Sequence, residues 1–130
     1  MIENIVVDTD IIIDHLRGVD KATSFLKDVE AKRYRAFIST ITEAELFSGS
    51  KLTPKEEAEI KKLLTIFNKI NVDSPIAYKA GWFRRTYHCN LSDAIIAATA
   101  YVKNKAKIIT RNIKHFEAIE EVECSKPMDS

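Results

Sequence analysis

Three acidic residues in this chain stand beside segments that a folded protein would bury. Asp8 directly follows the apolar run 5–7, Glu45 follows a second apolar segment by about a turn and a half of helix, and Asp93 immediately precedes the apolar segment 94–96. Charges next to buried surface are costly without a partner, and converging carboxylates repel one another unless a cation neutralises them. Oxygen ligands without histidine or cysteine favour Mg²⁺ or Mn²⁺. The pattern therefore predicts a carboxylate-held metal ion that activates water and stabilises a phosphoryl transition state.

Each acid also has an ordinary structural interpretation. An acid at the start of a helix is a good cap, which applies to Asp93 unless Ser92 is the cap and leaves Asp93 free. Thr110 and Asn112 follow a later apolar run, where they can hydrogen-bond to a metal-bound water or serve only as turn and N-cap residues. Taken singly, an acid of this kind is more often solvated than functional, so it is the joint pattern of the three acids that indicates a metal site.

The elements that would position these residues begin with the run Ile5-Val6-Val7. An uninterrupted β-branched run is typical of a strand buried on both faces. The apolar residues of segment 11–16 then fall at helical spacing, and Asp8 or Thr9 is a suitable N-cap before them. Ligands of open α/β folds bind at the carboxyl ends of the strands, which is where Asp8 stands.

The rest of the chain alternates between the two kinds of element. We expect further strands over residues 35–38, 69–72, 107–110 and, as a small edge strand, 121–124. We expect helices over 20–33, from 40 to before Gly49, from 54 to about 68, from 74 to before His88, over 94–102 and in a short stretch near 113–119. This alternation predicts an α/β fold with a mostly parallel sheet and helices on both faces.

Length and composition narrow the class of protein. A chain of 130 residues with 45% hydrophobic content is expected to be one domain, residues 1–130, and its net charge of +1 identifies no partner. It has no signal-peptide pattern and no apolar run near the roughly 20 residues needed to span a bilayer. Cys89 and Cys124 form no CxxC pair, so we expect reduced thiols in a cytoplasmic protein, with one disulfide as the lesser alternative.

Four stretches of the chain resemble, in order, the motifs of the PIN-domain ribonucleases, and specifically the VapC-like toxins of type II toxin–antitoxin pairs. They are Val7-Asp8-Thr9-Asp10-Ile11-Ile12-Ile13-Asp14 with Leu16-Arg17-Gly18, Ile38-Ser39-Thr40-Ile41-Thr42-Glu43-Ala44-Glu45-Leu46 with Gly49, Leu91-Ser92-Asp93-Ala94-Ile95-Ile96-Ala97-Ala98-Thr99-Ala100, and Ile109-Thr110-Arg111-Asn112-Ile113-Lys114-His115-Phe116. No single motif is decisive, but the four together are specific and span nearly the whole chain.

The resemblance implies a three-layer α/β/α sandwich and an endoribonuclease that depends on Mg²⁺ or Mn²⁺. Asp8 and Asp93 match the principal metal-binding aspartates of the family, and Glu45 matches its glutamate. Glu43, two residues earlier, is the alternative match for that glutamate. These three acids would hold the metal ion directly or through water. Such a site would leave a 5′-phosphate and a 3′-hydroxyl.

Other residues of the motifs are expected to support this site. Thr9 and Thr110 would hold the metal-binding groups in place. Many relatives carry a further acid in the last motif, whereas this chain has Asn112 and His115 there, which argues against a tightly held second metal ion. Asp10 stands where relatives often carry asparagine, and it could add an acid near the pocket.

Basic residues suggest where RNA would lie. Arg84, Arg85, Arg111 and Lys114 could contact the RNA backbone, a contact that depends on salt and not on sequence. An equally good explanation is that these residues are solvated surface charges that complement helix dipoles.

The resemblance also implies a homodimer and a cognate antitoxin protein that places a segment near the acidic pocket. An apolar helix face around Leu46, Phe47, Leu63 and Phe67 could be the docking groove for that segment or part of the core.

Three alternatives remain at the level of the sequence. The protein could be a PIN nuclease of RNA processing rather than a toxin, or a PIN module with an inactive site. A remote alternative is a phospho-receiver domain, with Asp73 after the third strand and Lys126-Pro127 near the end. That alternative lacks a final helix and leaves Glu45 and Asp93 unexplained.

Overall fold

A computed structural model describes residues 2–103 and 105–127, and within them it forms one parallel sheet of five strands. The strands follow the spatial order β3-β2-β1-β4-β5. Ile5, Val6 and Val7 of the central strand are completely buried, as the β-branched run predicts. The strand bounds are β1 Glu3–Val7, β2 Tyr34–Ser39, β3 Asn68–Ile70, β4 Lys107–Ile109 and β5 Cys124–Ser125.

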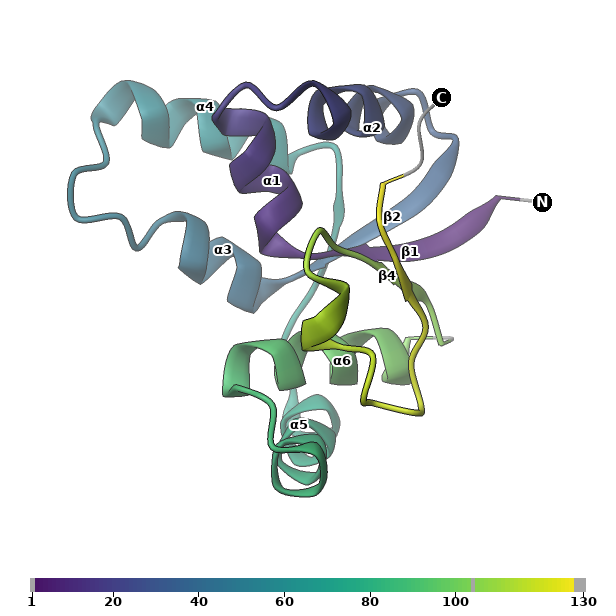
Figure 1. Ribbon diagram of the computed structural model, residues 1–130. Coiled ribbons are helices and arrows are strands. Elements are labelled where there is room, and N and C mark those ends of the chain that lie inside the picture. The colour runs from purple at the N-terminus through teal and green to yellow at the C-terminus, as the bar shows by residue number, and fades with distance from the viewer. Residues whose placement is uncertain (1, 104, 128–130) are drawn as a thin grey trace.

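Helices cover both faces of the sheet, so the expected α/β/α sandwich is confirmed (Figure 1). One face carries α1 (Thr9–Leu16), α2 (Asp20–Glu30) and α4 (Pro54–Leu64), and the other carries α5 (Ser74–Tyr87) and α6 (Leu91–Val102). The short helix α3 (Thr40–Leu46) continues from the carboxyl end of β2, and the 3₁₀ turn η1 (Ile113–His115) follows β4.

The alternation of side chains along the central strand divides the core into two halves. Ile5 and Val7 join the cluster that contains residues of α1, α2 and α4, whereas Val6 joins the cluster of α5, α6 and η1's neighbour Phe116. Successive strand residues point to opposite faces, so one buried strand anchors both helical layers.

The ends of some elements differ from the sequence expectation. The helix over 20–33 ends at Glu30, because the chain turns through Lys32, whose φ is +62°. The stretch 113–119 forms only the single turn η1, and the last strand is Cys124–Ser125 rather than 121–124. These differences lie at element ends, where local signals are weakest.

The start of α6 is also set differently. The N-cap is Asn90, whose side-chain oxygen accepts a hydrogen bond from the backbone N–H of Asp93 at 2.9 Å. Ser92 therefore is not the cap, and the helix begins at Leu91 instead of Ala94. Asp93 lies in the first turn with its carboxylate free for other contacts.

The register of β1 and β4 positions the last motif beside the first. Val7 pairs with Ile109, and the backbone N–H of Asp8 donates to the carbonyl of Ile109 at 2.9 Å. Both strands are parallel and end together, so Thr110 must lie next to Asp8.

Among the described residues, no helix combines the length and the apolar character needed to cross a membrane.

The Asn90 cap supplies a test of this local structure. Asn90→Ala removes the acceptor for an orphan helix N–H, so we expect it to lower the free energy of unfolding by about 1 kcal/mol. Urea unfolding followed by circular dichroism measures the change. Asn90→Ser, which keeps a capping oxygen, is the control, and equal losses in both variants would show that the cap is not what stabilises this turn.

Candidate active site

The carboxyl edge of the sheet brings together four acidic side chains from three separate segments. Asp8 follows β1 and caps α1, Asp10 lies in the first turn of α1, Glu45 lies on α3 and Asp93 lies in the first turn of α6. Figure 1 shows how β1 and β2 lead into α1 and α3 at the edge where α6 and η1 begin. The charges of Asp10 and Asp93 raise the pKa of Asp8, and those of Glu45 and Asp10 raise the pKa of Asp93.

Asp8 is held rigidly by two donors, one for each oxygen. Its Oδ1 accepts from the backbone N–H of Thr9 at 2.8 Å, and its Oδ2 accepts from the hydroxyl of Thr110 at 2.8 Å. Asp8 is only 6% exposed, and Thr110 is fully buried. The carboxylate therefore has a fixed orientation, as a metal ligand needs.

Asp10 lies next to Asp8 and shares the Thr110 hydroxyl with it. The Oδ2 atom of Asp10 lies 3.1 Å from that hydroxyl and accepts from the backbone N–H of Arg111 at 3.0 Å and the side-chain amide of Asn112 at 3.1 Å. A hydroxyl has one proton, so Thr110 can donate fully to only one carboxylate at a time. The other oxygen of Asp10, Oδ1, is buried and has no hydrogen-bond partner among the described residues.

Glu45 joins the group through hydroxyl donors. Its Oε1 accepts from the hydroxyl of Thr9 at 2.7 Å, and its Oε2 accepts from Ser92 at 3.2 Å. The hydroxyl of Thr9 is also 2.9 Å from that of Thr42, which is completely buried. Sequence reasoning missed Thr42, although it precedes Glu45 by three residues and so shares its helix face.

The rival glutamate points elsewhere. Glu43 forms an ion pair with Lys69 of β3, with 3.0 Å between the carboxylate oxygen and the ammonium nitrogen. The structure thus places Glu45, and not Glu43, next to Thr9 and Ser92.

Asp93 is 8% exposed and lies near a histidine for which the sequence patterns predict no role. The Nδ1 atom of His115, which is on η1, is 3.4 Å from the Oδ2 atom of Asp93. The last motif therefore contributes His115 to the site.

Burial and mutual repulsion raise the pKa values of three of the acids. The pKa of Asp8 rises to about 7, first because burial disfavours its charge and then because Asp10 lies beside it; the Thr110 hydroxyl partly offsets this rise. Burial also raises the pKa of Asp10 and of Asp93, and His115 opposes the shift for Asp93. The cluster is thus short of positive charge.

A divalent cation fits this deficit. The donors are all oxygens, one of them the unpartnered Oδ1 of Asp10. In the described part of the chain, no three side chains of aspartate, glutamate, histidine or cysteine are close enough to enclose a metal ion by themselves. A cation here would be held by one or two carboxylates and complete its shell with water, which is how Mg²⁺ binds.

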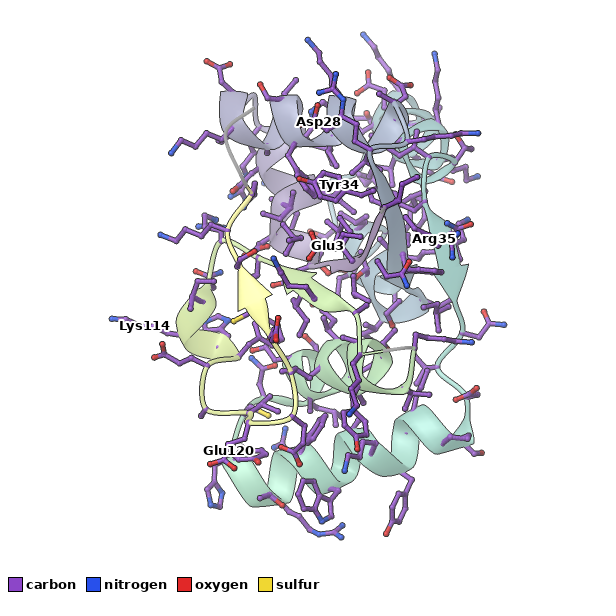
Figure 2. All side chains as sticks on the ribbon, turned by 90° about the vertical axis from the view of Figure 1, so that its right-hand side faces the viewer. Glu3, Asp28, Tyr34, Arg35, Lys114 and Glu120 are labelled. Carbon is purple, nitrogen blue, oxygen red and sulfur yellow. The ribbon has the colours of Figure 1, made fainter. Side chains whose placement is uncertain are left out.

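The expected basic residues fall into two groups. Arg111 is tied to the site, because its Nε is 3.0 Å from the carboxylate of Asp14 and its backbone N–H binds Asp10. Arg84, Arg85 and Lys114 are exposed, and Figure 2 shows Lys114 extending into solvent from the segment after β4.

The phospho-receiver alternative fails on the position of Asp73. This residue follows the edge strand β3, which β2 separates from β1. Its carboxylate accepts a hydrogen bond from the backbone N–H of Ile76 at 3.1 Å and caps α5. Asp73 is therefore a capping residue and does not share a pocket with Asp8.

Comparisons with known proteins agree with the architecture and the motifs. A model of the PIN domain family matches residues 5–122. The chain is 35% identical over 123 residues to Ribonuclease VapC10 of Mycobacterium tuberculosis, covering 91% of this chain and 90% of that protein. It is 31% identical over 118 residues to Ribonuclease VapC19 of the same organism, covering 85% and 90%.

Solved structures are also similar. A toxin–antitoxin complex from Klebsiella pneumoniae contains a chain with a TM-score of 0.78 and 34% identity, covering 96% of this chain and 98% of that one. A chain of DNA-bound VapBC from Salmonella typhimurium matches with a TM-score of 0.80 over 98% of this chain and 100% of that one, but at 19% identity this likeness concerns the fold alone.

The raised pKa of Asp8 predicts how stability depends on pH in metal-free buffer. The folded chain holds a proton on Asp8 up to about pH 7, whereas an unfolded aspartate loses it near pH 3.9. The folded state therefore binds more protons between these values, and the free energy of unfolding falls, by on the order of a few kcal/mol, as pH rises from about 4 to about 7.

Urea unfolding in EDTA at several pH values measures this slope. Asp8→Asn should flatten it, because the amide does not titrate, whereas the exposed Asp20→Asn should keep the wild-type profile. A wild-type profile that rises through the window would contradict the assignment.

Proposed function

The chain belongs to the PIN domain family, and from that premise we propose that it is the ribonuclease toxin of a toxin–antitoxin pair, cutting RNA with the help of Mg²⁺ or Mn²⁺. The observation that carries the proposal is the convergence of four carboxylates at the carboxyl edge of the sheet, with too few cations nearby to balance them. The names of the VapC relatives support the substrate class.

Asp8, Glu45 and Asp93 would hold the metal ion, directly or through water. When bound, a divalent cation neutralises the carboxylates, lowers the pKa of water and stabilises negative charge on a phosphoryl group. Thr9 and Thr110 fix the orientation of Asp8 and Glu45 by the hydrogen bonds described above. Asp10 keeps its Oδ1 atom free, so it can accept a hydrogen bond from water there.

An antitoxin protein is the proposed partner, because the similar solved chains come from toxin–antitoxin complexes. A groove of about 370 Å³ beside Glu45 suits a protein segment with apolar and basic residues, and its lining includes Leu46, Leu52, Ile60, Glu56 and Glu59. Leu46 and Phe67, expected as part of a docking face, are 6% and 7% exposed and belong to the core, although Leu46 also borders this groove. Self-association into a homodimer is part of the proposal, and light scattering on the free toxin measures it.

Cleavage of labelled RNA tests the enzyme. We expect cutting of a total RNA pool with Mg²⁺ or Mn²⁺ and none with excess EDTA. Asp8→Asn and Asp93→Asn should each reduce the rate by at least about 100-fold, because even groups that only orient metal ligands are worth 10- to 100-fold.

Asp20→Asn is the matched control for charge, since Asp20 is exposed in the first turn of α2. A folded, antitoxin-free protein that cuts nothing in either metal would favour an inactive PIN module. Cutting confined to one precursor RNA, without growth arrest on expression, would favour a processing nuclease.

Metal binding should also be visible without activity. Carboxylates must lose their protons to bind a cation, and the pKa of Asp8 is about 7. Mg²⁺ should therefore raise the melting temperature more at about pH 8 than at about pH 5, with a stabilisation of about 2.7 kcal/mol at one hundred times the dissociation constant.

Differential scanning calorimetry with and without Mg²⁺ measures this difference. Asp8→Asn should lose most of the metal-dependent shift at the higher pH, and Asp20→Asn should retain it. Equal shifts at both pH values in wild type and Asp8→Asn would place the metal elsewhere.

A further inference from the structure

Two adjoining hollows lead away from Asp93 across the surface. The first, about 240 Å³, lies between the end of α5, the start of α6 and η1, and its lining includes Asp93, Asn90 and Lys114. The second, about 440 Å³, is lined by Arg84 and Arg85 among others. Both are lined by His88 and Cys89. We call these two adjoining hollows together, with Arg84, Arg85, His88, Asn90 and Lys114 in their walls, the His88 groove.

A tight turn between α5 and α6 creates the groove. His88 ends α5 in the left-handed conformation, with φ of +59°, and two residues later Asn90 caps α6. This conformation is uncommon for residues other than glycine, with histidine, asparagine and aspartate enriched in it. The turn brings the last turn of α5, with Arg84 and Arg85, close to the first turn of α6, with Asp93.

The groove has an excess of positive charge, with Arg84, Arg85 and Lys114 against the one carboxylate of Asp93 in its lining. Arg84, Arg85 and Lys114 are exposed, and in residues 2–103 and 105–127 none of the three forms an ion pair with a carboxylate. The nearby Tyr87 is fixed in the wall, because its hydroxyl donates to Glu121 at 2.6 Å. Cations and an aromatic ring around a hollow are the features that bind phosphates and unstacked bases of single-stranded RNA.

The hollow on the other side of the acidic cluster has the opposite character. The groove beside Glu45 contains three glutamates, Glu45, Glu56 and Glu59, against one arginine, Arg17, and its other walls include apolar side chains. A polyanion is repelled there and attracted to the His88 groove. The two sides of the cluster therefore differ in which partner they can accept.

We propose that the His88 groove binds the single-stranded RNA that flanks the scissile phosphate, with Lys114, Arg84 and Arg85 contacting backbone phosphates and His88 stacking on a base. This inference rests on the proposed function for the substrate class. It adds a direction: the strand leaves the acidic cluster past Asp93 toward the end of α5, and not past Glu45.

Salt-dependent binding tests the phosphate contacts. The probe is a fluorescent 5′-labelled single-stranded RNA of mixed sequence, about 12 nucleotides long, titrated in EDTA so that cleavage plays no part. The variant Arg84→Gln/Arg85→Gln/Lys114→Gln should lower the slope of log K against log salt by about 2, because each lost single-strand phosphate contact is worth about 0.7.

The control is Lys27→Gln/Lys55→Gln/Lys62→Gln, which removes the same charge from exposed lysines of α2 and α4. It should change the slope far less. If both triple variants weaken RNA binding equally, or if the wild type does not bind RNA, the proposal is wrong.

A second variant tests the base contact and avoids a folding defect. His88→Asn removes the ring but keeps a residue that tolerates the left-handed conformation. We expect at least about fivefold weaker RNA binding with an unchanged salt slope, since stacking does not depend on counterion release. Unaltered affinity would overturn the stacking role.

Photocrosslinking of 4-thiouridine in the same RNA locates the strand. Crosslinks within 84–90 and 114–115 are expected, and crosslinks confined to the groove beside Glu45 would overturn the proposed direction.

Failure of the groove proposal and failure of the nuclease proposal can be told apart. RNA binding in the His88 groove without cleavage in any metal would refute the nuclease but not the groove. Cleavage by the triple groove variant at the wild-type rate and affinity would refute the groove alone. If the triple groove variant lost antitoxin binding but kept RNA binding, the His88 groove would be a protein-docking surface instead.

Discussion

Repulsion among carboxylates at the end of the central strand is the constraint on which the rest of this structure depends. Asp8 is nearly buried, has Asp10 beside it and feels the charge of Asp93, so its pKa rises to about 7. This arrangement opposes stability at Asp8, because its carboxylate loses water and no cation among its neighbours offsets the repulsion from Asp10 and Asp93. Under the proposed function a cation would relieve this repulsion, and in its absence the stability of the surrounding fold offsets the cost.

The surrounding fold holds the acids in place with neutral donors instead of cations. Thr110 and the backbone N–H of Thr9 bind Asp8, and Thr9 and Ser92 bind Glu45. Hydroxyl and amide donors orient a carboxylate without cancelling its charge, which leaves the charge available to a metal ion. The side-chain amide of Asn112 acts in the same way on Asp10, so the last motif supports an acid of the first.

The surface on either side of the cluster is divided by charge. Toward Glu45 the hollow is apolar and acidic, and toward Asp93 it is polar and basic. The two proposals therefore assign opposite sides of one acidic centre to partners of opposite charge, an RNA past Asp93 and a protein segment past Glu45. The turn at His88 is the local feature that makes this division, because it places the end of α5 beside the start of α6.

The sequence by itself determined the alternation of strands and helices, the buried central strand and the three acids that meet, because periodicity and motif order are local properties. It did not determine that Asn90, not Ser92, caps α6, or that His115 approaches Asp93, or that Thr42 supports Thr9. The Asn90 cap is a local contact, but Asn90 and Ser92 are both capping residue types, so only the structure decided between them. The other two contacts join segments far apart in the chain, through the register of β1 with β4 and the packing of α3 and α6 at one edge. The basic groove is of the same kind: its charges are plain in the sequence, but their position beside Asp93 comes from how two helices pack.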